Sequence, residues 1–331
     1  MNRVGVNGFG RIGRYFVRMA LQQADFEVAL VNDLADIRTL AHLFKYDSVH
    51  GRNHLKFDIE GDSLVFENGK RVTFCSHRNP EDIPWQQYNV ETVIESTGLF
   101  KSKEKASKHL VGGAKRVVIS APSSDAEVKT IVMGINEQLL TADDIVVSNA
   151  SCTTNNIAPL FAVMRELVNI ESAFITTVHS YTSDQRLHDA PHEDLRRARG
   201  AAQSMIPTST GAAKAITKIF PEYEGKIGGG AVRVPVPNGS LSDITMVVTE
   251  AVSAEQINEA MKKAANGKLK GILEYTEDPI VSVDILGNPV SCLYDAGLTA
   301  IVGKMIKIIG WYDNEAGYSN RLVDLVRYMG K

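Results

Sequence analysis

A glycine pattern near the amino terminus constrains the fold of this chain more than any other feature. In "RVGVNGFGRIGRYFVRMAL", a short apolar segment precedes Gly8, Gly10 and Gly13 in the spacing G-x-G-x-x-G, and a helical pattern follows. Glycines in such a turn permit a tight bend, a close approach of the backbone to a pyrophosphate, and close packing of helix on strand. The first helical turn offers N–H groups and a positive dipole end to phosphates. The apolar residues of the predicted helix share one face: Ile12, Phe16, Met19 and Ala20.

The next apolar segment supplies the context that a G-x-G-x-x-G pattern needs. "FEVALVND" reads as a second strand and ends at Asp33, about 20 residues after the last glycine. A carboxylate at this place accepts hydrogen bonds from ribose hydroxyls and repels a 2'-phosphate, which predicts NAD rather than NADP as the cofactor. A turn or capping role for Asp33 is the alternative.

Further strands extend the same order of strand and helix. "ETVIEST" and "KRVVISAP" end in small or hydroxyl residues, among them Thr97 and Ser120. The expected fold is α/β, a Rossmann-type doubly wound parallel sheet that binds its ligand at the carboxyl ends of the strands. Residues 54–77 instead predict hairpin strands with turns at 60–62 and 68–69, as an insertion.

Length, composition and net charge limit the classes of protein to which the chain can belong. The chain has 331 residues, of which 44% are hydrophobic and 23% charged, and this predicts two globular domains. The net charge of -3 gives no general attraction to nucleic acid or to an anionic membrane. No signal peptide and no run of about 18 apolar residues is apparent. We therefore expect a cytoplasmic protein, with neither nucleic acid nor membrane indicated as a partner.

The three cysteines are widely spaced and include no C-x-x-C pair, so reduced thiols are expected rather than a zinc site or a disulfide framework. Cys75 and Cys292 lie in apolar, strand-like segments, where a packing role is expected. No histidine, cysteine and carboxylate triplet has metal-ligand spacing, so no metal is expected.

Cys152 differs from the other two cysteines in its surroundings. It lies in "SNASCTTNNIAP", among hydroxyl and amide residues, immediately before apolar residues at helical spacing. A helix start favours thiolate over thiol, and a thiolate is a competent nucleophile. Ser151 or Thr153 is expected to cap this helix.

A nucleophilic thiol needs a base, and His179 is the candidate. It closes the predicted strand "SAFITTVHS" and leads into a polar loop. Anion recognition is indicated by three arginines in one loop, by the "TSTGAAK" segment before a helix, and by Arg233 in a strand. The loop arginines are Arg196, Arg197 and Arg199.

Six motifs occur in the order of one family: "ASCTTN", "HSYT-DQR", "DLRRAR", "P-STGAAKA", "RVPVPN" and "WYDNE-GYSNR". In these motifs the chain resembles the phosphorylating glyceraldehyde-3-phosphate dehydrogenases, and the resemblance covers essentially all 331 residues. It implies an NAD-binding domain of residues 1–150, completed by a C-terminal helix at 315–331. Residues 151–314 would form an α+β catalytic domain with a mixed sheet.

The resemblance also implies a reaction. Cys152 would add to the aldehyde of D-glyceraldehyde 3-phosphate and His179 would act as base, so that NAD is reduced and a thioester forms. Inorganic phosphate would cleave the thioester to 1,3-bisphosphoglycerate. The residues implied for the attacking phosphate are Ser151, Thr153, Thr210 and Gly211. Those implied for the substrate phosphate are Thr182, Arg197 and Arg233. The cofactor contacts implied are Gly8, Gly10, Arg11, Ile12, Gly13, Asp33, Arg78, Thr97, Ser120, Asn314 and Tyr318.

Several positions depart from the family pattern. Asn156 replaces a frequent second cysteine, Ala316 replaces a residue that is usually aromatic, and Gly239 lies in an altered segment, "VPNGSLSD". Pro191 favours NAD and lies in a loop that implies a homotetramer, although Ala190 beside it departs from the NAD pattern. Two alternatives remain open, an erythrose-4-phosphate dehydrogenase and a non-catalytic homologue that binds NAD or RNA.

Overall fold

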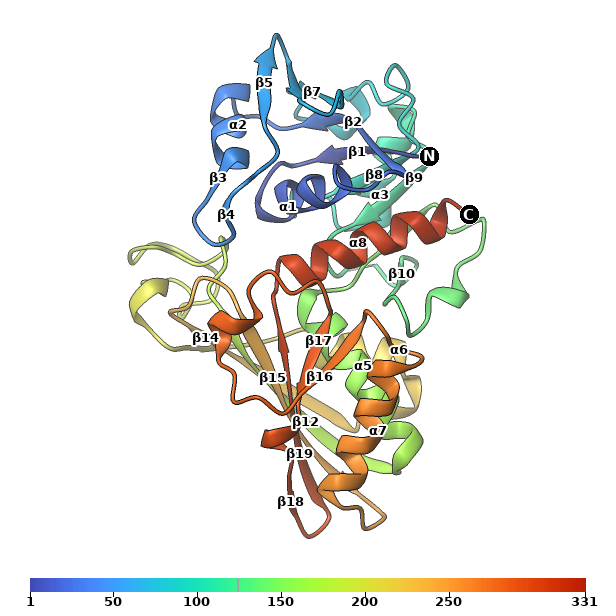
Figure 1. The fold of residues 1–331 in the computed structure, drawn as a ribbon, viewed down its shortest axis with the longest axis vertical. Coiled ribbons are helices and arrows are strands. Elements are labelled where there is room, and N and C mark those ends of the chain that lie inside the picture. Colours follow the sequence, from blue (N-terminus) through green and yellow to red (C-terminus); the bar gives the residue numbers. More distant parts are fainter. Residues whose placement is uncertain (124) are drawn as a thin grey trace. The chain divides into compact units, whose positions relative to one another are not determined.

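The computed structural model describes residues 1–123 and 125–331. The chain divides into two compact units, one formed by Met1–Ala150 with Ser319–Lys331 and the other by Ser151–Tyr318. Their elements are labelled in Figure 1. Within the described residues, none of the helices combines the length and the apolar character that crossing a bilayer requires.

The first unit is built on a nine-stranded sheet in the order β10-β11-β9-β8-β1-β2-β7-β6-β5. From β10 to β7 every pair of neighbours is parallel, and β6 and β5 add an antiparallel edge. The strands are β1 (Asn2–Asn7), β2 (Phe26–Asn32), β5 (Phe57–Glu60), β6 (Ser63–Phe66), β7 (Arg71–Cys75), β8 (Thr92–Glu95), β9 (Arg116–Ile119), β10 (Lys129–Thr130) and β11 (Val146–Ser148). The predicted Rossmann-type sheet and its hairpin insertion are confirmed.

Helices and a short ribbon complete this unit. The helices are α1 (Arg11–Ala20), α2 (Ile37–Lys45), α3 (Lys103–Ala106), α4 (Lys108–Val111) and the greater part of α8 (Ala316–Met329). The ribbon pairs β3 (Tyr46–Asp47) with β4 (Gly51–Arg52). Within the unit, the Arg327 guanidinium of α8 donates to the Asp25 carboxylate at 2.7 Å, which ties the end of the chain to the loop before β2.

The glycine turn between β1 and α1 has a steric cause. Gly8 has φ of +94°, and a Cβ there would lie 2.8 Å from the Thr97 nitrogen. A Cβ on Gly13 would lie 2.1 Å from the Gly8 carbonyl oxygen, whereas one on Gly10 would meet no heavy atom within 4 Å. The predicted helix is confirmed, and on its apolar face Ile12 and Met19 are half-buried. Its buried residues are Gly13, Phe16, Val17 and Ala20.

Buried polar side chains link the carboxyl ends of adjacent strands in this sheet. The Asn7 amide at the end of β1 donates to the Glu95 carboxylate of β8 at 2.7 Å. The Asn32 amide at the end of β2 donates to the Asn7 side-chain oxygen at 2.8 Å and to the His77 carbonyl at 2.9 Å. Each of these groups is satisfied, so the loops that follow the strands are held in register.

The second unit is built on a mixed sheet in the order β13-β14-β12-β15-β19-β17-β16, with β18 paired to β19. Neighbours β12 and β14 are parallel, while β12 and β15 are antiparallel, which confirms the predicted mixed sheet. The strands are β12 (Ile170–Ser180), β13 (Ile206–Thr208), β14 (Ile227–Val234), β15 (Ser240–Val248), β16 (Leu273–Thr276), β17 (Cys292–Asp295), β18 (Ala300–Val302) and β19 (Met305–Tyr312).

Three helices pack together on one side of this sheet (Figure 1). They are α5 (Cys152–Leu167), α6 (Ala212–Ile219) and α7 (Ala254–Asn266). The predicted capping box of α7 is confirmed, because the Ser253 hydroxyl accepts from the Gln256 N–H and the Gln256 side chain accepts from the Ser253 N–H. The α+β character of this unit follows from three helices on one face of a mostly antiparallel sheet.

The structure accounts for two departures from the family pattern. Gly239 has φ of +85°, and a Cβ there would lie 2.2 Å from the Ser282 carbonyl oxygen, so a side chain has no room. Ala316, the first residue of α8, is fully buried, and its N–H donates to the Asp313 carboxylate at 2.8 Å. A small residue fits both positions.

Candidate active site

Cys152 is the first residue of α5, as the sequence predicts. Ser151 is the N-cap, and its hydroxyl oxygen accepts from the Thr154 N–H at 3.0 Å. Immediately before it, Ala150 has φ of +58°, in the left-handed region that non-glycine residues seldom adopt. This sharp entry to the helix places the thiol at the end that carries the unpaired backbone N–H groups.

His179 lies beside Cys152, near the end of β12. Its Nε2 is 3.5 Å from the Cys152 Sγ, and its Nδ1 is 2.7 Å from the Ser180 carbonyl oxygen. A carbonyl oxygen only accepts, so we assign the imidazole proton to Nδ1. That tautomer leaves a lone pair on Nε2 facing the sulfur, where it can accept a proton from the thiol or from an atom bound to it.

Arg233 approaches the imidazole from the neighbouring strand. It lies on β14 directly opposite His179 on β12. Its Nη1 is 3.0 Å from the His179 Nδ1, and it donates to the Ser180 carbonyl and to the Thr182 hydroxyl, each at 3.1 Å. Nη1 carries two protons, which these two oxygens accept, so the His179 Nδ1 remains a donor to the Ser180 carbonyl. One guanidinium group therefore fixes the carbonyl that holds the base and reaches the Thr182 hydroxyl.

Burial and charge set the protonation of the pair. Burial and the Arg233 charge lower the pKa of His179 to about 3, so the imidazole is neutral at neutral pH. Burial raises the pKa of the Cys152 thiol, and the Arg233 charge, the Thr153 hydroxyl and the backbone N–H groups of the helix start oppose that effect without cancelling it. The helix start therefore lowers the pKa of the thiol, as predicted, while burial has the larger and opposite effect.

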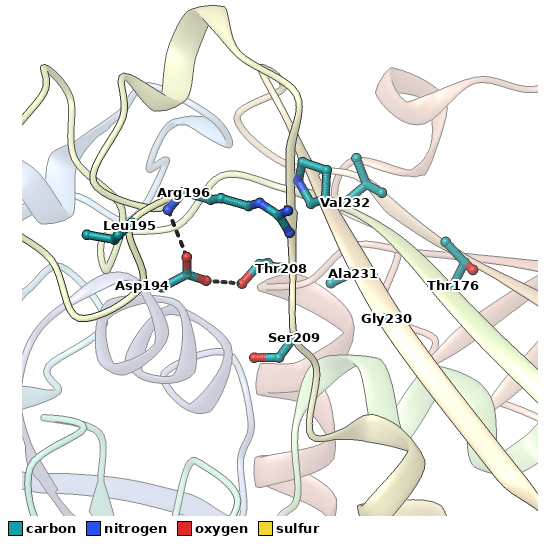
Figure 2. Close-up of a pocket in the computed structure, with 10 residues that line it drawn as sticks. Thr176, Asp194, Leu195, Arg196, Thr208, Ser209, Gly230, Ala231 and Val232 are labelled. Carbon is teal, nitrogen blue, oxygen red and sulfur yellow. Dashed lines mark hydrogen bonds between the residues drawn. The ribbon is translucent and has the colours of Figure 1, made fainter.

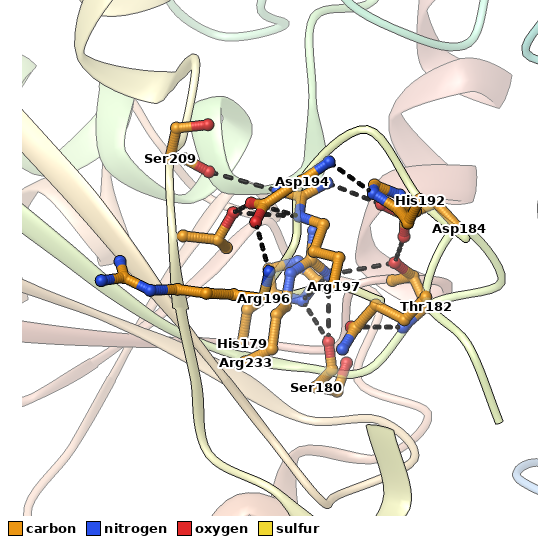
Figure 3. Close-up of polar contacts among 12 residues, drawn as sticks. His179, Ser180, Thr182, Asp184, His192, Asp194, Arg196, Arg197, Ser209 and Arg233 are labelled. Atoms are coloured by element: carbon orange, nitrogen blue, oxygen red, sulfur yellow. Dashed lines mark hydrogen bonds and ion pairs between the residues drawn. The ribbon is translucent and has the colours of Figure 1, made fainter. Parts of the chain in front are cut away.

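A carboxylate links two of the predicted phosphate-binding residues (Figure 3). The Asp184 side chain accepts a short hydrogen bond from the Thr182 hydroxyl and pairs with the Arg197 Nη1 at 2.6 Å. Burial raises the pKa of Asp184, but the Thr182 hydroxyl and the charges of Arg233 and Arg197 outweigh it and hold that pKa below its usual range. Asp184 is therefore a charged carboxylate between the Thr182 hydroxyl and the Arg197 guanidinium.

The hydroxyls predicted for the attacking phosphate have protein partners. The Thr153 hydroxyl lies 2.9 Å from the Tyr312 hydroxyl, which also lies 2.9 Å from the Thr177 hydroxyl. The Thr210 hydroxyl accepts from the Ala212 N–H at 3.2 Å, and Gly211 is the N-cap of α6. Among the described residues, no hydrogen bond joins Thr210 or Gly211 to Cys152 or His179.

The structure places most of the predicted cofactor residues at strand ends of the first unit. The Asp33 carboxylate at the end of β2 accepts from the Phe9 N–H at 2.7 Å and from the Ala35 N–H at 3.0 Å. Asp33 thus has the turn role that the sequence left as the alternative, in addition to any role toward ribose. Arg11 in the first turn of α1 pairs with Asp47 at 2.8 Å, and Arg78 after β7 is exposed.

Two further strand ends carry hydroxyl residues. Thr97 follows β8, and both its N–H and its hydroxyl donate to the Glu95 carboxylate. The N–H of Ser120, just after β9, donates to the Glu95 carbonyl oxygen at 2.9 Å. Asn314 and Tyr318 belong to the second unit and are buried, with 7% and 4% of their surface exposed.

A surface hollow of the second unit lies beside Arg197, which donates to the Thr208 hydroxyl and to the Ser209 carbonyl in its wall. It has a volume of about 520 Å³ and is open to solvent (Figure 2). None of the predicted catalytic or phosphate-binding residues lines it. Its walls include Asp194, Leu195, Arg196, Thr208 and Val232.

Sequence reasoning missed some residues that organise the site. Asp184 and Ser180 stand in the quoted motif "HSYT-DQR" but received no role, although a carboxylate between two phosphate ligands is a usable signal. Tyr312, whose hydroxyl bridges Thr153 and Thr177, had no signal beyond its place in "WYDNE-GYSNR".

The dinucleotide-type sheet of one unit is that of an NAD-dependent dehydrogenase, and the other unit holds a Cys–His pair beside an arginine cluster. Comparisons with known proteins agree. Residues 2–103 match the model of the glyceraldehyde 3-phosphate dehydrogenase NAD binding domain, and residues 151–314 match that of its C-terminal domain.

Among the described residues, no three His, Cys, Asp or Glu side chains lie close enough together to hold a metal ion.

Curated relatives match along the whole chain. Glyceraldehyde-3-phosphate dehydrogenase 2 of Streptomyces avermitilis is 53% identical, over 99% of this chain and 98% of its own length. Glyceraldehyde-3-phosphate dehydrogenase 1 of Bacillus cereus and the glyceraldehyde-3-phosphate dehydrogenase of Geobacillus stearothermophilus are each 52% identical, with the same coverage. The chain belongs to the glyceraldehyde-3-phosphate dehydrogenase family.

The first unit fits NAD. Gly10 leaves open space at the start of α1, where the helix N–H groups point outward, and the Asp33 carboxylate stands at the neighbouring strand end. Gly8 and Gly13 are required by the turn itself, because a Cβ at either would meet backbone atoms.

The glycines predict two different mutant phenotypes. Gly13→Ala should lower the free energy of unfolding by about 1–3 kcal/mol, because the new methyl group collides with the Gly8 carbonyl. Gly10→Ala should leave the stability of NAD-free protein nearly unchanged but weaken NAD binding, because the methyl group fills the approach to the pyrophosphate. Urea unfolding and calorimetric titration measure the two effects. Equal loss of stability in both variants would contradict this assignment.

Arg233 predicts a shift in the titration of the base. Replacing it with alanine removes a positive charge and part of the burial, and both changes should raise the pKa of His179 from about 3 toward the ordinary value of 6.5. NMR titration of labelled imidazole measures the pKa, and a Cys152→Ala background removes the thiol from the titration. Arg233→Lys is the matched control and should keep most of the lowering. An unchanged midpoint in Arg233→Ala would contradict this account.

Proposed function

We propose that this chain catalyses the phosphate-dependent oxidation of D-glyceraldehyde 3-phosphate to 1,3-bisphosphoglycerate, with Cys152 as nucleophile and His179 as base. The observation that carries the proposal is the 3.5 Å contact between the Cys152 Sγ, at the start of α5, and the His179 Nε2, to which the assigned tautomer leaves a lone pair. When bound, NAD supplies the hydride acceptor. We also propose that residues 1–150 with the C-terminal helix form the NAD-binding domain and that residues 151–314 form the catalytic domain.

The first steps belong to the Cys–His pair. As Sγ bonds to the aldehyde carbon, His179 Nε2 takes the thiol proton and passes it to the carbonyl oxygen, which gives a hemithioacetal and leaves Nε2 unprotonated again. Nε2 then takes the hydroxyl proton as the carbon loses its hydride, and a thioester remains on Sγ. The Ser180 carbonyl accepts from Nδ1 throughout and keeps Nε2 aimed at the reacting atoms.

Phosphate completes the reaction. Its oxygen bonds to the thioester carbon and the C–S bond breaks, which releases the acyl phosphate, and Nε2 returns its proton to the Cys152 Sγ. We assign the attacking phosphate to Ser151, Thr153, Thr210 and Gly211. We assign the phosphate of the substrate to Thr182, Arg197 and Arg233. The contacts of these residues support the second group, because Arg233 donates to the Thr182 hydroxyl and Asp184 links that hydroxyl to the Arg197 guanidinium.

We further propose that the chain works as a homotetramer in the cytoplasm. Large apolar side chains on the second unit are exposed in the single chain, which supports contact with other copies. Phe174 on the uncovered side of β12 is 55% exposed, and Leu195 at the rim of the hollow in Figure 2 is 82% exposed. Light scattering coupled to size-exclusion chromatography measures the assembly, and a monomer would refute this part of the proposal.

Substrate and cofactor choice are tested by NADH formation with NAD, phosphate and D-glyceraldehyde 3-phosphate, beside NADP and D-erythrose 4-phosphate. Turnover that needs phosphate and prefers NAD and the triose supports the proposal. Preference for the tetrose would assign the chain to the erythrose-4-phosphate reaction. If the folded protein shows no turnover with either substrate, only a binding function remains.

The roles of the pair predict distinct variants. Cys152→Ala should abolish turnover and spare NAD binding, because it removes the atom that carries the acyl group. His179→Asn should slow turnover on the order of 10²- to 10⁴-fold, because the proton acceptor is lost while the fold is kept. Steady-state kinetics and calorimetric NAD titration measure both. Normal turnover by either variant would defeat the assignment.

A further inference from the structure

Two buried serine hydroxyls converge on the side chain of Asn314. The Ser180 hydroxyl donates to the Asn314 Oδ1 at 2.9 Å, and the Ser240 hydroxyl donates to the same oxygen at 3.1 Å. Ser180 ends β12 and Ser240 begins β15, and 0% and 1% of their surfaces are exposed. The pair is therefore fixed by the sheet and shielded from water.

The bonding pattern sets the orientation of the amide. The Ser240 hydroxyl oxygen already accepts from the Ser180 N–H at 3.1 Å, so its proton is free to point at Asn314. With Oδ1 between them, both hydroxyl protons have an acceptor. In a flipped amide, these protons would have only each other's oxygen, 3.4 Å away, so one of them would lose its acceptor. The structure thus holds the oxygen inward and the NH₂ group outward.

The outward NH₂ group is the part of Asn314 available to a ligand. Asn314 is 7% exposed, and within the described part of the chain its Nδ2 has no hydrogen-bond partner. The Nδ2 atom is not one of the fully buried side-chain atoms that lack a partner, so it is accessible and a ligand acceptor can bind it. An amide oxygen, such as that of the nicotinamide carboxamide, has the required chemistry.

We propose that Ser180 and Ser240 are positioning residues for the cofactor: they lock the Asn314 amide so that its NH₂ group is presented to the carboxamide of bound nicotinamide. This inference rests on the proposed function, which assigns Asn314 to the carboxamide. Ser180 also holds His179 through its carbonyl oxygen. One residue therefore orients both the base and the amide that directs the nicotinamide ring.

The test compares two ligands that differ only in the nicotinamide end. Calorimetric titration of Ser180→Ala and Ser240→Ala should show NAD binding weakened about two- to tenfold in each, because each loses one buried hydrogen bond. ADP-ribose, which lacks the nicotinamide, should bind both variants as it binds the wild-type chain. Equal weakening of NAD and ADP-ribose would mean a structural role only and would overturn the inference.

Ser242→Ala is the matched control. Ser242 lies two residues further along β15, is fully buried, and its hydroxyl oxygen has no hydrogen-bond partner among the described residues. The substitution removes the same atom from the same strand without removing a hydrogen bond. NAD affinity should stay at the wild-type value, and a loss equal to that of Ser240→Ala would overturn the inference.

A double-mutant cycle isolates the path through Asn314. Asn314→Ala should weaken NAD but not ADP-ribose, and in that background Ser180→Ala and Ser240→Ala should cost no further NAD affinity. Additive losses would overturn the inference while leaving the proposed function intact. Failure of the wild-type chain to bind NAD would refute the proposed function instead.

The stereochemistry of hydride transfer gives a second readout. In the Ser180→Ala/Ser240→Ala variant the Asn314 amide is mobile, so we expect hydride to be transferred to both faces of the nicotinamide ring.

Discussion

The hydrogen bond between the His179 Nδ1 and the Ser180 carbonyl oxygen is the constraint on which the chemistry of this chain depends. It selects the tautomer in which the lone pair of Nε2 faces Cys152. The Arg233 guanidinium donates to the same carbonyl from the next strand. Because parallel pairing sets His179 opposite Arg233, the register of β12 and β14 fixes this geometry. Backbone pairing, and not loop conformation, therefore places the base.

The same principle applies to the first unit, where the binding loops follow strands whose ends are tied together. Glu95, Asn7 and Asn32 form a buried polar row across three adjacent strands, and Glu95 also accepts from the Thr97 N–H and hydroxyl. Asp33 restrains the glycine turn through the Phe9 N–H. Satisfied buried polar groups favour one arrangement over near alternatives, and a preorganised surface loses less entropy when it binds a dinucleotide.

Much of the fold and of the site could be predicted from the sequence, because it depends on residues that are close together along the chain. The spacing of Gly8, Gly10 and Gly13 predicted a strand, a turn and a helix, and Cys152 was placed correctly at a helix start because the pattern there depends on near neighbours. What the sequence left open depends on distant contacts. The hydrogen bonds from the Phe9 N–H to Asp33 and from Arg197 to Asp184 join segments that only the fold brings together. The burial that raises the pKa of Cys152 likewise depends on the folded surroundings of the thiol.

The central claim is that Cys152 carries an acyl group between oxidation and phosphorolysis, and a single-turnover experiment tests it most directly. Rapid mixing of the enzyme with NAD and D-glyceraldehyde 3-phosphate, without phosphate, should give a burst of NADH at most equal to the number of Cys152 sites. Added phosphate should then start steady turnover, because only phosphate releases the thioester. Full-speed turnover without phosphate, or a burst of equal size from a chain that lacks the Cys152 thiol, would contradict the account.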